Sequence, residues 1–130
     1  MKTLLYLSTL CFTFFLLPGC ADKPTEGTHV TMFVINQNGI TQEGREVYVF
    51  KESKEGGITK KPSNALDVKL TDDNGMVQFN LEEPNLFQSD ETAVFSFEVM
   101  EIQDGDFVSL ASFVQEIKPG DIVNQTLIMQ

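Results

Sequence analysis

From residue 29 onward, short apolar runs alternate with polar turn sequences along the chain. The runs are rich in Val, Ile, Phe and Thr, the residue types that favour β-strands. Val77, Phe79 and Leu81 are apolar with Gln78 and Asn80 between them, and Leu66–Leu70 alternates in the same way, so each of these strands is expected to bury one face. The pattern predicts seven strands: His29–Ile35, Glu46–Phe50, Leu66–Leu70, Met76–Leu81, Ala93–Ile102, Phe107–Glu116 and Ile122–Met129.

Tight-turn dipeptides separate several of these runs. Asn38-Gly39, Asn74-Gly75 and Asp104-Gly105 each pair a residue that tolerates positive φ with a glycine that accepts it readily. Asp104-Gly105 lies between the two longest runs and predicts a hairpin there. No window sustains a helical period. These features predict an all-β domain, a seven-stranded antiparallel β-sandwich.

The order of strands and turns resembles that of known sandwiches. A strand that ends in Asn-Gly is followed by Gly44-Arg45-Glu46-Val47-Tyr48-Val49, a long loop, and Thr71-Asp72-Asp73-Asn74-Gly75-Met76-Val77-Gln78-Phe79. This order is similar to that of the transthyretin-like and carboxypeptidase-regulatory-like domains. The resemblance implies a Greek-key sandwich of transthyretin-like or immunoglobulin-like type, which is often an adhesive, accessory or spacer module in cell-envelope proteins.

The first nineteen residues have the plan of a secretory signal peptide. Lys2 supplies a positive charge, residues 4–17 are uncharged and mostly apolar, and Pro18-Gly19 ends the run. The run is shorter than the roughly 20 apolar residues of a spanning helix. Leu17-Pro18-Gly19-Cys20 resembles the lipobox of bacterial lipoproteins, which implies cleavage before Cys20 and a diacylglycerol on its thiol. We therefore expect a signal peptide over residues 1–19, a lipidated Cys20 with a polar tether over 20–28, and the β-sandwich domain over 29–130.

The lipobox resemblance also implies a location. Ala21 separates Asp22 from Cys20, so the acidic residue associated with inner-membrane retention is absent from the second mature position. The resemblance therefore favours the outer membrane of a bacterium, with a membrane partner reached through the N-terminal lipid. It leaves open whether the domain faces the periplasm or the cell surface.

The charge balance and the counts of histidine and arginine disfavour two classes of function, nucleic-acid binding and acid–base catalysis. The chain has nine basic and nineteen acidic residues and a net charge of −10, which disfavours nucleic-acid partners because acidic surfaces repel phosphates. A single histidine, His29, and a single arginine, Arg45, leave most roles of an acid–base active site unfilled. We expect a non-enzymatic protein without a cofactor. A carboxylate-dependent hydrolase that uses Glu82 and Glu83 is the less favoured alternative.

Two acidic turns carry oxygen ligands of the kind that calcium prefers. They contribute Asp72 and Asp73 in one turn and Asp104 and Asp106 in the other. Neither turn has the spacing of an EF-hand loop, and Asp and Asn form turns without any metal. We expect no metal site and interpret these residues as turn formers.

The segment Lys51–Ala65 concentrates positive charge on an acidic chain. Lys51, Lys54, Lys60 and Lys61 are four of the nine basic residues, and loops of this length are often functional or mobile. One hypothesis is a contact loop that engages an acidic envelope protein or a glycan. The other is a solvated loop whose lysines protect an adjacent edge strand from aggregation. We expect a non-catalytic binding, adhesion or spacer role, with an accessory subunit of an envelope assembly as the alternative.

Overall fold

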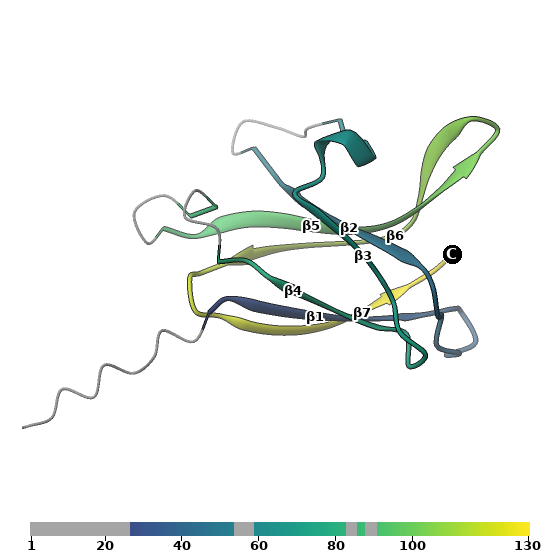
Figure 1. The fold of residues 1–130 in the computed structure, drawn as a ribbon, viewed down its shortest axis with the longest axis horizontal. Coiled ribbons are helices and arrows are strands. Elements are labelled where there is room, and N and C mark those ends of the chain that lie inside the picture. Colours follow the sequence, from purple (N-terminus) through teal and green to yellow (C-terminus); the bar gives the residue numbers. More distant parts are fainter. Residues whose placement is uncertain (1–26, 54–58, 83–85, 88–90) are drawn as a thin grey trace, which may run out of the picture.

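The computed structural model describes residues 27–53, 59–82, 86–87 and 91–130. These residues form two β-sheets packed face to face, which confirms the all-β sandwich (Figure 1). Along the chain the elements are β1 (His29–Ile35), β2 (Glu46–Lys51), the 3-10 helix η1 (Pro62–Asn64), β3 (Asp67–Leu70), β4 (Met76–Asn80), β5 (Ala93–Gln103), β6 (Asp106–Ile117) and β7 (Ile122–Ile128). The seven strands lie within two residues of the predicted ones.

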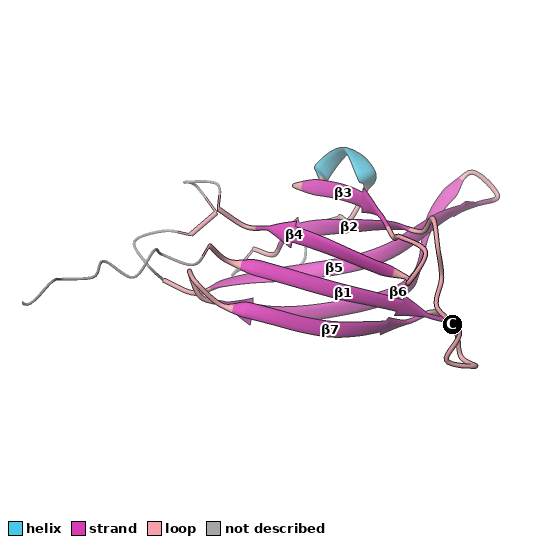
Figure 2. Ribbon diagram, turned by 60° about the horizontal axis from the view of Figure 1, so that its bottom comes forward, coloured by secondary structure: helices cyan, strands magenta, loops and turns pink. Residues whose placement is uncertain are grey.

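The strands divide unequally between the sheets. One sheet has the order β4-β1-β7 and the other has the order β3-β2-β5-β6 (Figure 2). Every strand pairing is antiparallel, as predicted, except that of β1 with β7, which is parallel. The short turn after β6 explains the exception. It returns the chain beside the start of β1, where the His29 N–H donates to the Asp121 carbonyl (3.0 Å), and β7 then runs in the same direction as β1.

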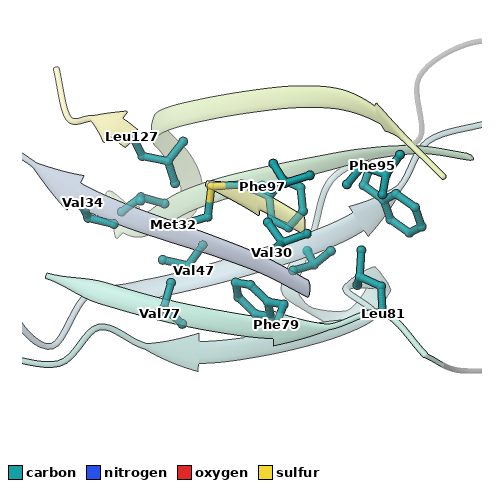
Figure 3. Packing of buried hydrophobic residues seen from close by; sticks show 14 of the residues in the cluster. Val30, Met32, Val34, Val47, Val77, Phe79, Leu81, Phe95, Phe97 and Leu127 are labelled. Carbon is teal, nitrogen blue, oxygen red and sulfur yellow. The ribbon is translucent and has the colours of Figure 1, made fainter. Parts of the chain in front are cut away.

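The core lies between the two sheets and consists of period-two side chains. Val30, Met32 and Val34 on β1 are fully buried, and Phe79 on β4 packs against Phe97 on β5 with ring centroids 5.9 Å apart (Figure 3). Val77, Phe79 and Leu81 are buried while Gln78 and Asn80 are exposed, so the alternation predicted for Val77–Leu81 is confirmed. Large, branched and aromatic side chains of this kind supply the burial that stabilises a domain without disulfides.

The prediction for Leu66–Leu70 was wrong. Leu66, Val68 and Leu70 are 42%, 46% and 63% exposed, and they point away from the core. The register explains this orientation, because Val68 lies opposite Tyr48, and both belong to the outer face of the four-stranded sheet. The inward position of β3 is taken by Lys69, whose Nζ lies 5.6 Å from the Phe79 ring centroid. Alternation shows which side chains share a face, but it does not show which face meets the core.

The hairpin predicted at Asp104-Gly105 is confirmed. Asp104 (φ 53°) and Gly105 (φ 89°) both adopt positive φ, as a two-residue turn that follows the twist of its strands requires. The two long strands β5 and β6 meet at this turn, and Figure 1 shows their hairpin curling away from the body of the sandwich. In the described part of the chain, no helix is long and apolar enough to cross a membrane.

Candidate binding face

The outer face of the four-stranded sheet carries a second, smaller apolar cluster. Tyr48, Phe50 and Met100 are 7%, 0% and 8% exposed although they point away from the main core. Ala65, which belongs to the segment 59–66 that includes η1, packs against this cluster. We call this segment the strap. Figure 2 shows η1 beside β3, on the side of the four-stranded sheet that faces away from β1 and β7.

Hydrogen bonds and an ion-pair network fix the strap in place. At its C-terminal end, the Leu66 N–H donates to the Val49 carbonyl (2.8 Å). At its other end, Lys60 Nζ lies 2.6 Å from Glu98 Oε1 and 3.0 Å from Glu52 Oε1. Glu98 is only 2% exposed and lies on β5, in the middle of the covered face. The strap therefore closes over a buried negative charge and neutralises it.

Two hydroxyl groups complete the surroundings of Glu98. Ser112 Oγ donates to Glu98 Oε1 at 2.9 Å, and Ser109 Oγ donates to Glu98 Oε2. Three donors from two elements thus satisfy one buried carboxylate, as a buried charge requires. Because a one-sided loss would leave this charge uncompensated, Lys60 and Glu98 act as a pair.

The electrostatics of the pair follow from its geometry. Burial disfavours the charged form of Lys60, but hydrogen bonds and attraction to Glu98 and Glu52 outweigh burial and raise the pKa of Lys60. Burial likewise opposes the ionisation of Glu52, yet its hydrogen bond and attraction to Lys60 lower the pKa of Glu52. Both groups therefore stay charged across the neutral pH range.

Tyr48, on the same outer face, also has a shifted pKa. The Tyr48 hydroxyl donates to a carboxylate oxygen of Glu46 on the same strand. Burial, the hydrogen bond to Glu46 and the charge of Glu46 together raise the pKa of Tyr48 to about 12. The phenol is therefore a neutral donor at any physiological pH.

An open hollow lies between the strap and the β5–β6 hairpin. Its walls are formed by Thr59, Lys60, Lys61, Gly105, Asp106 and Phe107. The apolar side chains near the hairpin tip are strongly exposed, with Ile102 at 65% and Phe107 at 45%. These two residues lie opposite each other in the register. The hollow combines an aromatic ring, a lysine and a carboxylate within reach of solvent.

The structure separates the four predicted contact-loop lysines. Lys51 ends β2 and is partly buried, Lys60 is held by Glu98 and Glu52, and Lys61 is exposed at the rim of the hollow. Lys54 lies outside the described residues. The positive charge of Lys60 is therefore committed to the fold, and Lys61 is the lysine that this geometry offers to a partner. Whether the segment is a contact loop stays a prediction.

The other predicted site residues have local roles or fall outside the description. Asp72 Oδ1 accepts hydrogen bonds from the backbone N–H groups of Asn74 and Met76, both at 2.9 Å, so it closes its own turn. Asp73, Asp104 and Asp106 lie on exposed turns or strand ends. Within residues 27–53, 59–82, 86–87 and 91–130, no three His, Cys, Asp or Glu side chains gather as metal ligands would. Cys20 and Glu83 lie outside these ranges, and Glu82 is exposed.

The sequence contained a signal for Glu98 that periodicity alone does not reveal. In Phe95-Ser96-Phe97-Glu98-Val99-Met100 one acidic residue interrupts a run whose two faces are otherwise apolar or small. A carboxylate in such a place is buried only when it is paired. The pattern therefore implies a cationic partner, although it does not identify Lys60.

Comparisons with known proteins support the fold. No protein-family model matches the chain, and no curated protein matches it. A streptococcal ancillary pilin of known structure is similar over 82% of this chain and 33% of its own, with 16% identity and a TM-score of 0.54. The chain thus spans about a third of the length of that pilin. At this identity the likeness concerns the fold, and it agrees with an all-β sandwich.

Two dioxygenase structures resemble the chain more distantly. One is the dioxygenase domain of a dioxygenase carbohydrate-binding protein fusion from Streptomyces sp. SirexAA-E (11% identity, 85% of this chain, 83% of that chain, TM-score 0.46). The other is 3-chlorocatechol 1,2-dioxygenase from Rhodococcus opacus (10% identity, 85% of this chain, 62% of that chain, TM-score 0.40).

Proposed function

We propose that this protein is a lipid-anchored module of the bacterial cell envelope, with a non-catalytic binding, adhesion or spacer role. The outer face of the four-stranded sheet is the observation that carries the proposal. There the chain buries Glu98 beneath the strap and neutralises it with Lys60. A buried ion pair stabilises a fold little, so holding a surface segment in one position is its better-attested use. An organised outer face is more useful to a binding module than to a protein that serves only as a spacer.

The anchor half of the proposal rests on the lipobox resemblance at Cys20. The variant Cys20→Ser removes the only thiol that can carry the lipid at this position, so the protein is expected to leave the membrane fraction. Its leader is also expected to remain uncleaved. The effect is large, because each buried methylene contributes about 0.8 kcal/mol and two acyl chains make dissociation negligible.

A matched control is available within the same leader. Cys11→Ser changes the other cysteine of the chain, which the proposed cleavage removes, so membrane association is expected to stay at the wild-type level. The measurement is the distribution of the protein between membrane and soluble fractions, with precursor size read on a gel. Unchanged membrane association of Cys20→Ser would remove the lipoprotein assignment.

The proposed binding role is tested with a substitution of Lys61. This lysine is exposed beside the hollow, and Lys118 is exposed in the turn after β6, so Lys61→Gln and Lys118→Gln remove the same charge at different places. We expect proteins captured from envelope extract to be depleted for Lys61→Gln only, and the difference to shrink above ~0.15 M salt, where screening shortens electrostatic reach to about 8 Å. Lys60 is left intact because its removal would disturb the fold. Equal capture by both variants would show that the loop is only a solvated segment.

A further inference from the structure

The edge strand β3 presents an unusual row of exposed aliphatic side chains. Val68 and Leu70 share one face of β3, Leu66 is the last residue of the strap directly before the strand, and the three side chains are 46%, 63% and 42% exposed. Single exposed apolar residues are common on protein surfaces, but neighbouring ones on one face mark interaction sites. The row is continuous with the apolar cluster in the middle of the same outer face, because Val68 lies opposite Tyr48 of that cluster. It thus forms the uncovered margin of the apolar outer face.

The backbone of β3 is open on the side away from β2. Among the described residues, β3 ends the four-stranded sheet and pairs only with β2. The Thr71 N–H donates to the Arg45 carbonyl, just before β2 (3.0 Å). In an antiparallel strand the backbone groups of successive residues point alternately toward the neighbouring strand and away from it. Val68 and Leu70 therefore direct their backbone groups toward the free edge. There the Val68 N–H donates to the Asp67 carboxylate of its own strand (2.8 Å).

One end of the row is surrounded by acidic side chains. Glu46 lies directly opposite Leu70, and Asp72 and Asp73 follow in the adjoining turn. Glu43 is brought to the same end, because the next residue, Gly44, donates its N–H to the Thr71 carbonyl (3.0 Å). These four carboxylate residues are exposed. Two neighbouring cations already have partners: Arg45 faces Glu101 at 3.6 Å, and Lys69 of β3 lies 3.9 Å from Asp67 and donates to the Gln78 carbonyl at 2.9 Å.

The acidic residues around β3 determine which kind of partner its open edge can bind. A second copy of the chain would bring the same carboxylates and the same net charge of −10 to the contact, and an anionic lipid surface would also be repelled. A segment that carries Lys or Arg meets complementary charge instead. The aliphatic row requires apolar side chains at alternate positions of that segment, since alternate residues of a strand share a face.

We propose that the open edge of β3 docks an extended segment of another protein, which adds to the four-stranded sheet as a fifth strand. Its backbone pairs with Val68 and Leu70, its alternate aliphatic side chains cover the exposed row, and its basic residues lie beside Glu46 and the acidic turn. This inference rests on the proposed binding role and names the chemistry of the partner.

The test selects peptides on the protein itself. A library of randomised heptapeptides is panned against the immobilised purified protein at low salt, and the enriched peptides are sequenced. The expected peptides alternate aliphatic residues and carry Lys or Arg toward one end. No enrichment, acidic peptides, or sequences without alternation would each overturn the proposal. Concentration-dependent dimerisation of the protein through β3, measured by size exclusion, would instead assign the edge to a second copy.

Variants locate the binding of the enriched peptides. Val68→Pro removes an N–H that the ladder with β2 does not use, and Leu70→Ser removes most of one exposed aliphatic side chain. Each is expected to weaken peptide binding by about tenfold or more, while thermal unfolding stays near that of the wild type. The control Ile122→Ser alters an aliphatic residue of similar exposure (61%) on β7 and is expected to bind normally. Equal affinity of all the variants would refute docking at β3.

The proposal for β3 and the proposed envelope function can be refuted separately. A protein that loses its membrane association in Cys20→Ser and its captured proteins in Lys61→Gln, yet binds no alternating basic peptide, would keep the envelope role and lose only the fifth strand. A peptide that binds at β3 in a protein whose membrane association does not depend on Cys20 would have the opposite meaning.

Discussion

Removal of Lys60 is the most direct perturbation of the outer face. In Lys60→Met the stem of the side chain is retained while the charge is lost, so the Glu98 carboxylate stays buried at 2% exposure without its cation. Breaking a buried pair from one side costs about 3–5 kcal/mol. Two serine hydroxyls still donate to Glu98, which places the expected loss of unfolding free energy near the lower limit, at about 3 kcal/mol.

The reciprocal change is expected to cost less. In Glu98→Gln the buried group becomes neutral, and Lys60 keeps Glu52 at 3.0 Å, so the expected loss is about 1–2 kcal/mol. Once Lys60 is gone, Glu98→Gln relieves an unpaired charge, and the double variant should be no less stable than Lys60→Met. The two substitutions are therefore non-additive, and the coupling free energy is about 1–2 kcal/mol or more.

Urea unfolding followed by far-ultraviolet circular dichroism measures these differences, since the chain has no tryptophan to report by fluorescence. The exposed neighbour Lys61 supplies the control, and Lys61→Met is expected to stay within about 0.5 kcal/mol of the wild type. A loss below that value for Lys60→Met, or additive effects in the double variant, would refute the assignment of the strap to a buried ion pair.

The pH dependence gives an independent check. Lys60 has a folded-state pKa above its ordinary value of 10.5, so its contribution is complete below 10.5 and is lost as pH rises through the folded-state pKa. Glu52 has a folded-state pKa below its ordinary value of 4.5, so its contribution is present above 4.5 and is lost as pH falls through the folded-state pKa. The stability difference between the wild type and Lys60→Met should therefore be flat between about pH 5 and 10 and shrink on either side.

Three further changes test other parts of the structure. Phe79→Ala is expected to cost about 3–5 kcal/mol in urea unfolding, whereas the exposed neighbour Gln78→Ala should stay within about 0.5; equal effects would contradict the register of β4. The Tyr48 phenol should titrate near pH 12 by absorbance at 295 nm in the processed protein, and Glu46→Gln should lower its pKa; titration near pH 10 while the fold is intact would contradict its burial. Gly75→Ala should destabilise the domain by more than about 1 kcal/mol, because φ is +71° and a Cβ would lie 2.6 Å from a backbone carbonyl of β1; wild-type stability would show that the turn adapts.

The sequence allowed the strands and turns to be predicted because both depend on local chemistry. Period-two runs such as Val77–Leu81 need one buried face, and Asp104-Gly105 supplies the positive φ of a tight turn. Two packed sheets follow from these elements, since a sheet with one apolar face must cover it. What could not be predicted is how the elements meet. The parallel partnership of β1 with β7 joins residues about 90 positions apart, and no local pattern encodes it.

The candidate site depended still more on tertiary contacts. Lys60 was recognised as part of a basic segment, but its partner Glu98 is 38 residues away on a different element. A lysine in a polar loop has the same local pattern whether it is solvated or pinned to a buried carboxylate. The outward face of β3 was missed for a related reason, because the apolar alternation of residues 66–70 is satisfied equally well by a core and by an uncovered surface.

The two outer faces of the sandwich differ in a way that bears on function. Across the middle of the three-stranded sheet, Gln78, Thr31 and Asn124 form a polar row, and no strap covers it among the described residues, although Phe33, Ile122 and Ile128 are exposed on the same sheet. Across the other sheet the register aligns Val68 with Tyr48, and Tyr48 with Glu98 beneath the strap. A protein selected only to remain folded gains nothing by covering one outer face with a pinned segment and leaving an aliphatic margin beside it. Places where a sequence departs from its own burial pattern are where binding sites are expected. The pinned strap and the aliphatic margin beside it are two such places, and they lie together on the four-stranded sheet.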